Sequence, residues 1–288
     1  MDKHLMVKMI SNNKILEIGL NKNYRLLDIE GIESSDYELS IVNTAQFDGG
    51  VVVNRRVQNR PISLSADFIG DNQGGERKKL ISFFNPNQKG VLIINYDGNE
   101  RAIEYEIENF NSKITNIYDS LSFTVDLICP NPYWRDLLES KINIALWKGK
   151  FHFPLVMPKN VGVIIGLREP SLIVNANNVG DVESGIMIEF KALGTLKNPS
   201  LLNVNTGEFF KINKTMMAGE IIKVDTNRGS KNVMRNFNGI ETNIINLIDL
   251  DSTFLQLRAG DNLFRYDSEE NLNNLEISIY YNPYYLGV

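Results

Sequence analysis

The chain has 288 residues, of which 43% are hydrophobic and 23% are charged, and its formal net charge at pH 7 is −5. This composition is typical of a globular protein, and the length suits one large domain or two medium ones. The negative charge argues against specific binding to nucleic acid, which needs a clustered basic surface. The longest basic run, Arg77-Lys78-Lys79, is better explained as the solvated face of a helix.

The cysteine count argues against a protein stabilised by disulfides, and the hydropathy pattern argues against a secreted or membrane-anchored protein. The only cysteine is Cys129, so no disulfide can form within the chain, and stability must come from the core and from interfaces. The first ten residues carry charges and no apolar run, which is typical neither of a signal peptide nor of a membrane anchor. We therefore expect a protein that is made in a cytoplasm and has no membrane partner.

The N-terminal half is predicted to consist of short strands around one helix. In residues 62–68 every second side chain is apolar, which is typical of a half-buried strand. Residues 75–85 favour a helix, since Leu80, Phe83 and Phe84 share one face and Pro86 ends the pattern. The other expected strands are residues 14–18, 24–29, 91–96, 101–108 and 120–129.

A proline-rich corner closes this half at residues 129–134, Cys-Pro-Asn-Pro-Tyr-Trp. Two prolines this close cannot lie in a central strand or in a helix interior, because each lacks an N–H and fixes φ. The Tyr-Trp pair supplies a large surface with polar ends. We expect Trp134 to be buried between the two halves or against the predicted helix. The residues assigned to this structural corner are Pro130, Pro132, Tyr133 and Trp134.

The C-terminal half is predicted to be a second β domain. About eight short strands at turn spacing follow residue 171, which favours a β-sandwich or jelly roll. Residues 148–170 contain three prolines and several apolar side chains, so we interpret them as a covering loop with short strands. The predicted domains are residues 1–140 and 141–288.

The search for chemistry returns no catalytic, cofactor-binding or metal-ligating constellation. His4 and His152 lie far apart in sequence without cysteine or carboxylate at ligand spacing, so no zinc site is expected. Cys129 has no histidine nearby and is better explained as a small buried apolar residue than as a nucleophile. No glycine-rich phosphate loop is present in the sequence. We therefore predict that the protein is not an enzyme and needs no cofactor.

Two groups of residues leave alternatives open. Asp249 and Asp251 would share a face at strand spacing, so a calcium site or a glycosidase pair is conceivable beside the simpler hypothesis of a polar turn. Four tyrosines around Pro283 could stack on sugar rings, although sealing the last strand is their simpler use. These are Tyr280, Tyr281, Tyr284 and Tyr285.

An ordered set of motifs resembles the phage distal tail protein (Dit) family over nearly the whole chain. In the N-terminal half the motifs are Gly49-Gly50, Arg55-Arg56, Arg60-Pro61-Ile62 and the corner at 129–134. In the C-terminal half they are Asn178-Val179-Gly180-Asp181, Lys197-Asn198-Pro199, Ala218-Gly219-Glu220, Val224-Asp225-Thr226, residues 257–262 and residues 285–288. Each motif alone is weak, and the specificity lies in their order.

The resemblance implies a fold and a role. The fold would be mainly β, with a tail-tube-like β-sandwich carrying one helix and a galectin-like or jelly-roll β-sandwich after it. Residues 1–140 would form a homohexameric ring that joins the tail tube to the tail tip, and residues 141–288 would lie at its periphery. The implied partners are further copies of the chain, the tail tube protein, the tail-associated hub protein and receptor-binding proteins, all in the virion tail tip. A carbohydrate-binding module that contacts the host cell wall is the alternative.

One run of the N-terminal half suits such a ring. Residues 51–53 are three valines, and Arg55 and Arg56 follow, so the run is strand-prone but too polar for a monomer core. We expect an arm that pairs with a neighbouring subunit, because ring closure removes the hazard of an unpaired strand edge. The residues assigned to the ring interface are Phe47, Gly49, Gly50, Arg55, Arg56 and Arg60.

Overall fold

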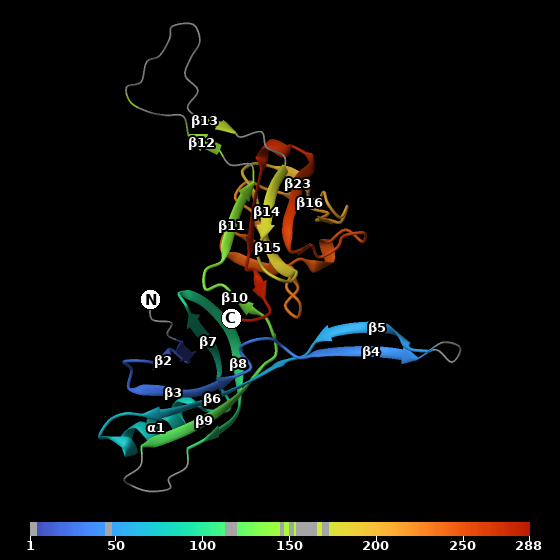
Figure 1. Cartoon of the computed structure of the whole chain (residues 1–288). Coiled ribbons are helices and arrows are strands. Elements are labelled where there is room, and N and C mark those ends of the chain that lie inside the picture. The colour runs from blue at the N-terminus through green and yellow to red at the C-terminus, as the bar shows by residue number, and fades with distance from the viewer. Residues whose placement is uncertain are drawn as a thin grey trace. The chain divides into compact units, whose positions relative to one another are not determined.

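The computed structural model describes residues 5–43, 48–112, 120–144, 147–149, 153, 166–168 and 173–288. The chain forms two compact units, and strands dominate both (Figure 1). Unit 1 comprises Met1–Leu137 and Tyr284–Val288, and unit 2 comprises Leu138–Pro283. The units meet between Leu137 and Leu138, close to the boundary predicted after residue 140. The chain end belongs to unit 1 because β25 (Tyr284–Tyr285) pairs with β10 (Trp134–Arg135).

Unit 1 is built around a sheet that closes on itself. Its strands run in the order β8, β7, β1, β2, β3, β6 and β9, and β9 pairs with β8 as well as with β6, while β10 and β25 extend from β8. The bounds are β1 (Met6–Ser11), β2 (Lys14–Ile18), β3 (Tyr24–Glu30), β6 (Arg60–Phe68), β7 (Lys89–Tyr96), β8 (Asn99–Asn111) and β9 (Leu121–Cys129). The mainly β fold with one helix is confirmed, with a closed sheet in place of two separate layers in this unit.

The core of unit 1 follows the alternation seen in the sequence. Ile62, Leu64 and Ala66 of β6 are fully buried, because alternate side chains of a strand point to the same face. The helix α1 (Gln73–Phe83) begins slightly earlier than predicted, since the side chain of Asn72 accepts a hydrogen bond from the Gly75 N–H at 3.1 Å and caps it. Its predicted apolar face, Leu80, Phe83 and Phe84, is buried.

Unit 2 consists of two antiparallel sheets that share one hydrophobic core, the arrangement of a β-sandwich. The first sheet contains β11 (Ser140–Ile144), β24 (Leu275–Tyr281), β15 (Ser184–Ala192), β19 (Ile221–Asp225), β20 (Asn232–Phe237), β21 (Ile240–Asn243) and β22 (Gln256–Leu257). The second contains β14 (Ile173–Asn178), β23 (Gly260–Glu270), β16 (Leu196–Asn203), β17 (Phe209–Lys211) and β18 (Thr215–Met216). Phe190 of β15, Leu201 of β16 and Phe264 of β23 all enter the core, which is why both sheets are needed to bury it.

The remaining elements are short. β12 (Trp147–Gly149) pairs with β13 (Gly166–Arg168), and the 3₁₀ turns η1 (Ile245–Leu247) and η2 (Leu272–Asn274) connect strands of unit 2. None of the described helices has the length and apolar character needed to cross a membrane. His4, His152 and most of the predicted covering loop at 148–170 lie outside the described residues.

Candidate interaction surfaces

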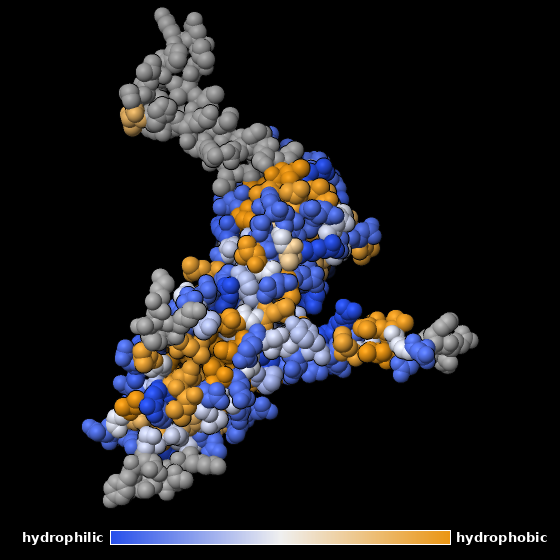
Figure 2. Space-filling view, in the orientation of Figure 1, coloured by the Kyte–Doolittle hydropathy of each residue, from blue (hydrophilic) through white to orange (hydrophobic). Residues whose placement is uncertain are grey.

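The ribbon formed by β4 (Tyr37–Asn43) and β5 (Gly50–Val57) is the most unusual surface of unit 1. Within the described part of the chain, β4 and β5 pair only with each other and do not join the closed sheet (Figure 1). The ribbon exposes a run of large apolar side chains, which Figure 2 shows in orange. They are Tyr37, Leu39, Ile41, Val42, Val51, Val52 and Val53, with 37% to 64% of each residue accessible. An isolated two-stranded ribbon is at best marginally stable in water, so this one needs a partner surface.

The strand register sorts these side chains onto two faces. Leu39 lies opposite Arg55 and Ile41 opposite Val52, and a register shift between Ser40 and Ile41 accommodates an extra residue on β5. Cross-strand neighbours share a face, so Leu39, Ile41 and Val52 form one apolar face. Arg55 is the only charged side chain on that face of the paired strands.

The two arginines of the ribbon differ in their pairing. Arg56 Nε lies 2.5 Å from Glu38 Oε2 across the strands, and this hydrogen bond, followed by one from Gln58, lowers the pKa of the Glu38 carboxyl. Arg55 forms no ion pair with any described residue. Arg55 is thus the charge left for a partner, whereas the charge of Arg56 is already matched within the ribbon.

The other predicted interface residues near the ribbon tip have simple conformational roles. Gly49 adopts a φ of +95°, which favours glycine at the start of the returning strand. At Gly50 a Cβ atom would lie 2.6 Å from Ile41 Cγ2, so a larger residue would push the strands apart. Phe47 lies outside the described residues.

Arg60 is a correction to the predicted interface, because it is buried inside unit 1 with 1% of the residue accessible. Its Nε donates to the Pro132 carbonyl at 2.9 Å, Nη1 to the Gly31 carbonyl at 2.7 Å, and Nη2 to the Leu286 carbonyl at 2.5 Å. Burial lowers the pKa of the guanidinium, and the three carbonyl oxygens replace the water it loses. Arg60 therefore holds the monomer together and is not available to a neighbouring subunit.

The predicted corner surrounds this arginine. Trp134 is fully buried, as expected, in the core of unit 1, and the Arg60 guanidinium carbon lies 5.7 Å from its ring centroid. Tyr133 stacks on Tyr284 with the ring centroids 5.6 Å apart. Pro132 contributes its carbonyl to Arg60, whereas Pro130 is exposed in the bend. The corner is thus a packing and hydrogen-bonding centre of unit 1.

The C-terminal tyrosines are occupied by structural contacts. Tyr281 is buried and its hydroxyl donates to the Asn177 carbonyl at 2.9 Å, while Lys141 Nζ lies 4.8 Å from the ring centroid of Tyr280. In unit 1 the guanidinium carbon of Arg101 lies 3.4 Å from the Tyr285 ring centroid. These contacts favour the hypothesis that the tyrosines seal the last strands over the hypothesis that they stack on sugar.

The motif residues of unit 2 are buried polar anchors of turns. Asn178 Nδ2 donates to the Val182 and Leu257 carbonyls, both at 3.0 Å, and Asn262 Nδ2 donates to the Arg258 carbonyl at 2.7 Å. Thr226 Oγ1 accepts from the Ile186 N–H and donates to the Ile186 carbonyl. Glu220 is fully buried and lies 2.8 Å from Lys214 Nζ and 2.7 Å from Arg235 Nε. Each satisfies buried polar groups and so fixes a turn.

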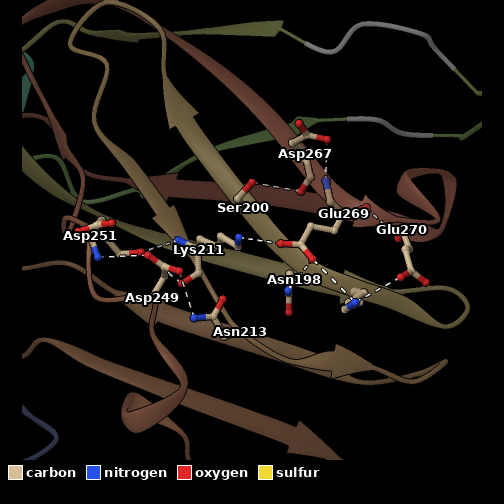
Figure 3. A network of polar contacts seen from close by, with 12 residues as sticks. Asn198, Ser200, Lys211, Asn213, Asp249, Asp251, Asp267, Glu269 and Glu270 are labelled. Atoms are coloured by element: carbon tan, nitrogen blue, oxygen red, sulfur yellow. Dashed lines mark hydrogen bonds and ion pairs between the residues drawn. The ribbon is translucent and has the colours of Figure 1, made fainter.

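The acidic residues tested as a catalytic pair belong to the polar network of Figure 3. Asp249 accepts hydrogen bonds from Asn213 Nδ2 and from the Asp251 N–H, both at 3.1 Å, which defines a turn. These bonds lower the Asp249 pKa, the opposite of what a general acid requires. In the same network Lys211 Nζ lies 2.8 Å from Glu269. The polar-turn hypothesis is therefore the better one.

The remaining candidates for chemistry are inert by the same criteria. Burial raises the pKa of the Cys129 thiol to about 12, so it is protonated at neutral pH and a poor nucleophile. Among the described residues, no group of three or more histidine, cysteine, aspartate or glutamate side chains is arranged to hold a metal ion.

Comparison with known proteins finds a similar family and similar folds. Residues 179–285 match the family model of the siphovirus-type tail component, C-terminal domain. This part of the chain is similar to the C-terminal domain of siphovirus-type tail components. The matched span includes the anchors Glu220, Thr226 and Asn262. No curated protein matches the chain.

Solved structures extend the similarity to the whole length. The Dit protein of phage SPP1, described as a paradigm of the hub adsorption apparatus in phages that infect Gram-positive bacteria, aligns with a TM-score of 0.68 and 12% identity over 96% of this chain and 98% of that chain. Two structures of the phage P2 baseplate in its activated conformation each align with a TM-score of 0.56. The structure with Ca has 9% identity over 98% of both chains, and the structure with Sr has 10% identity over 96% of this chain and 97% of that chain. The resemblance to distal tail proteins is thus confirmed at the level of the fold.

Proposed function

We propose that this protein is the distal tail protein of a phage tail or a phage-tail-like particle, and that six copies close into a ring between the tail tube and the tail tip. The β4–β5 ribbon carries this proposal. It exposes apolar side chains on a strand pair that has no further strand partner in the described part of the chain. Packing against a neighbouring copy would bury this surface, and a head-to-tail contact repeated around an axis closes into a ring.

The two units divide the work in this proposal. Unit 1 forms the ring and contacts the tail tube protein and the tail-associated hub protein. Unit 2 lies at the periphery and docks receptor-binding proteins without catalysing a reaction. The carboxylates of its polar network already have partners, since Glu269 pairs with Lys211 and Asp249 accepts the hydrogen bonds of a turn. This supports docking over hydrolysis.

The mass of the purified full-length protein tests the ring. We expect light scattering and native mass spectrometry to give six times the monomer mass. A variant in which a short Gly-Ser linker replaces residues 37–57 should keep the circular dichroism spectrum of a β protein and lose the sixfold mass, because the ribbon is not part of the closed sheet. A sixfold mass that survives this deletion would show that the ribbon is not the contact. A monomer at every concentration would contradict the ring itself.

A further inference from the structure

Strand β2 of the closed sheet has a continuous strand partner on one side only. On that side it pairs with β1 from Ser11 opposite Lys14 to Val7 opposite Ile18. On the other side it meets β3 at a single position, where Ile18 lies opposite Tyr24. The segment between Lys14 and Glu17 is therefore an open strand edge within the described part of unit 1.

The turn that precedes β2 decides which backbone groups face this edge. Asn12 and Asn13 form a two-residue turn with φ of +46° and +62°, as in a tight β-hairpin. In such a hairpin the residues next to the turn form a hydrogen-bonded pair, and the pairs alternate along the strands. The N–H and C=O groups of Ile15 and the N–H group of Glu17 consequently point to the open edge, where no described strand pairs with them, whereas the Glu17 C=O faces Tyr24 at the contact with β3.

A hollow of about 800 Å³ lies between this edge and helix α1. Leu16, Leu80 and Phe83 supply apolar lining. Two side-chain bridges connect its walls: Lys14 Nζ donates to Ser82 Oγ at 3.1 Å, and the Tyr24 hydroxyl donates to Glu76 at 2.7 Å. Glu76 and Ser82 are about 9 Å apart along the helix axis, which is the length of about three residues in extended conformation.

The charge around the hollow is positive. Lys14, Lys78 and Lys79 line it together with a single carboxylate, that of Glu76. Glu76 is already paired with Lys79 at 2.5 Å. Lys14 and Lys78 form no ion pair with any described residue, so two ammonium groups remain without a carboxylate partner.

We propose that this hollow binds an extended segment of another protein, which adds a short strand to the open edge of β2 and carries an apolar side chain next to a carboxylate. The N–H and C=O groups of Ile15 and the N–H group of Glu17 would supply the hydrogen bonds of strand addition. The apolar side chain would pack on Leu80 and Phe83, and the carboxylate would pair with Lys78. The contact does not involve the β4–β5 ribbon, so it stands whether or not that ribbon closes a ring.

Fluorescence anisotropy with a labelled peptide tests this site on the full-length protein. The probe is a capped Val-Glu-Val-Glu-Val peptide, and the control peptides replace both glutamates by lysine or N-methylate the central backbone amides. We expect only the unmodified acidic peptide to bind below about 1 mM, because both the strand hydrogen bonds and the carboxylates are needed. Hydrogen exchange at the Ile15 and Glu17 amides should slow when it binds.

Matched variants locate the binding. Lys78 is exposed and unpaired, so Lys78→Glu should leave the fold intact and weaken the acidic peptide by about tenfold or more. Arg258→Glu, an equal change of charge at an exposed site of unit 2, should have no effect. Equal binding of the lysine peptide, unchanged exchange at Ile15 and Glu17, or full affinity in Lys78→Glu would overturn the proposal. Loss of self-association in Lys78→Glu would also overturn the proposal, because the hollow would then be a contact between copies of this chain.

Discussion

The Arg60 guanidinium donates a 2.5 Å hydrogen bond to the Leu286 carbonyl oxygen, across 226 positions of sequence. Two glycines allow the backbone to approach this arginine closely. A Cβ atom at Gly31 would lie 2.1 Å from the Pro61 carbonyl oxygen, and one at Gly287 would lie 1.8 Å from the Glu33 carbonyl oxygen. The C-terminal segment is thus an integral part of unit 1.

Replacing Arg60 should destabilise unit 1 strongly. Arg60→Ala removes three hydrogen bonds to half-buried carbonyl groups and empties the space of a fully buried side chain, so we expect the free energy of unfolding to fall by about 3–5 kcal/mol. Urea denaturation of the full-length protein measures this change. Arg55→Ala on the exposed ribbon is the control and should change the stability of the fold by about 0.5 kcal/mol or less. A loss below about 1 kcal/mol in Arg60→Ala would contradict the role assigned to its hydrogen bonds.

Trp134 should contribute through its ring, which packs in the core and contacts Arg60, and not through a hydrogen bond. Its Nε1 is buried and has no hydrogen-bond partner among the described residues, so Trp134→Phe should cost much less than Trp134→Ala, which we expect to lose about 3–5 kcal/mol. In a Trp147→Phe background Trp134 is the only tryptophan, and acrylamide should quench its emission weakly when it is excited beyond the absorption of tyrosine. Full quenching by acrylamide would show that Trp134 is accessible to solvent and would contradict its burial.

The two ribbon arginines should differ in their effect on assembly. Arg55→Glu places the opposite charge on the apolar face, and loss of a paired charge buried at the proposed interface would cost about 3–5 kcal/mol per site. Arg56→Glu sets a carboxylate opposite Glu38 and should destabilise the ribbon by about 1 kcal/mol or less. Sedimentation velocity at several concentrations compares the two. Stronger disassembly in Arg56→Glu than in Arg55→Glu would contradict the assignment of faces.

The buried carboxylate of Glu220 should make unit 2 sensitive to acid. Burial raises its pKa, but the bonds from Lys214, Arg235 and the Met217 N–H outweigh this and hold the pKa below its usual range. The ionised form is therefore favoured in the folded state. Its stabilisation is complete above the unfolded pKa of about 4.3 and is lost as the pH falls through the lower folded pKa.

Urea denaturation between pH 7 and pH 3 measures this loss. Glu220→Gln should cost about 3–5 kcal/mol at pH 7, because it leaves two cations without their buried partner, and it should flatten the acid dependence. Glu183→Gln, which removes an exposed carboxylate paired with Arg228, is the matched control and should change little. An unchanged acid profile in Glu220→Gln would assign the sensitivity to other carboxylates.

We expect no specific glycan binding by the full-length protein. Tyr281→Phe removes the hydrogen bond to the Asn177 carbonyl and should lower stability by about 1 kcal/mol without creating or abolishing a glycan signal. A glycan array measures the signal for both proteins. A specific micromolar hit that Tyr281→Phe abolishes would favour the carbohydrate-binding alternative.

The sequence by itself determined the local elements. Alternate apolar residues in 62–68 predicted β6, and the spacing of Leu80, Phe83 and Phe84 predicted the buried face of α1, because these periodicities are local properties of strands and helices. The burial of Trp134 was also predicted from the corner. The ordered motifs predicted the distal tail fold, and the solved structures confirm it.

Only the tertiary structure decided which residues share a site. Arg60 is close to Arg55 and Arg56 in sequence, and the sequence predicts it to share their interface. It lies in the core instead, because its guanidinium donates to the carbonyl groups of Gly31, Pro132 and Leu286. The pairing of Arg56 with Glu38, which leaves Arg55 opposite Leu39, rests on a cross-strand register, and the open edge of β2 rests on which strand follows it in the closed sheet. Strand order and register arise from contacts between segments distant in sequence, so a pattern of neighbouring residues does not encode them.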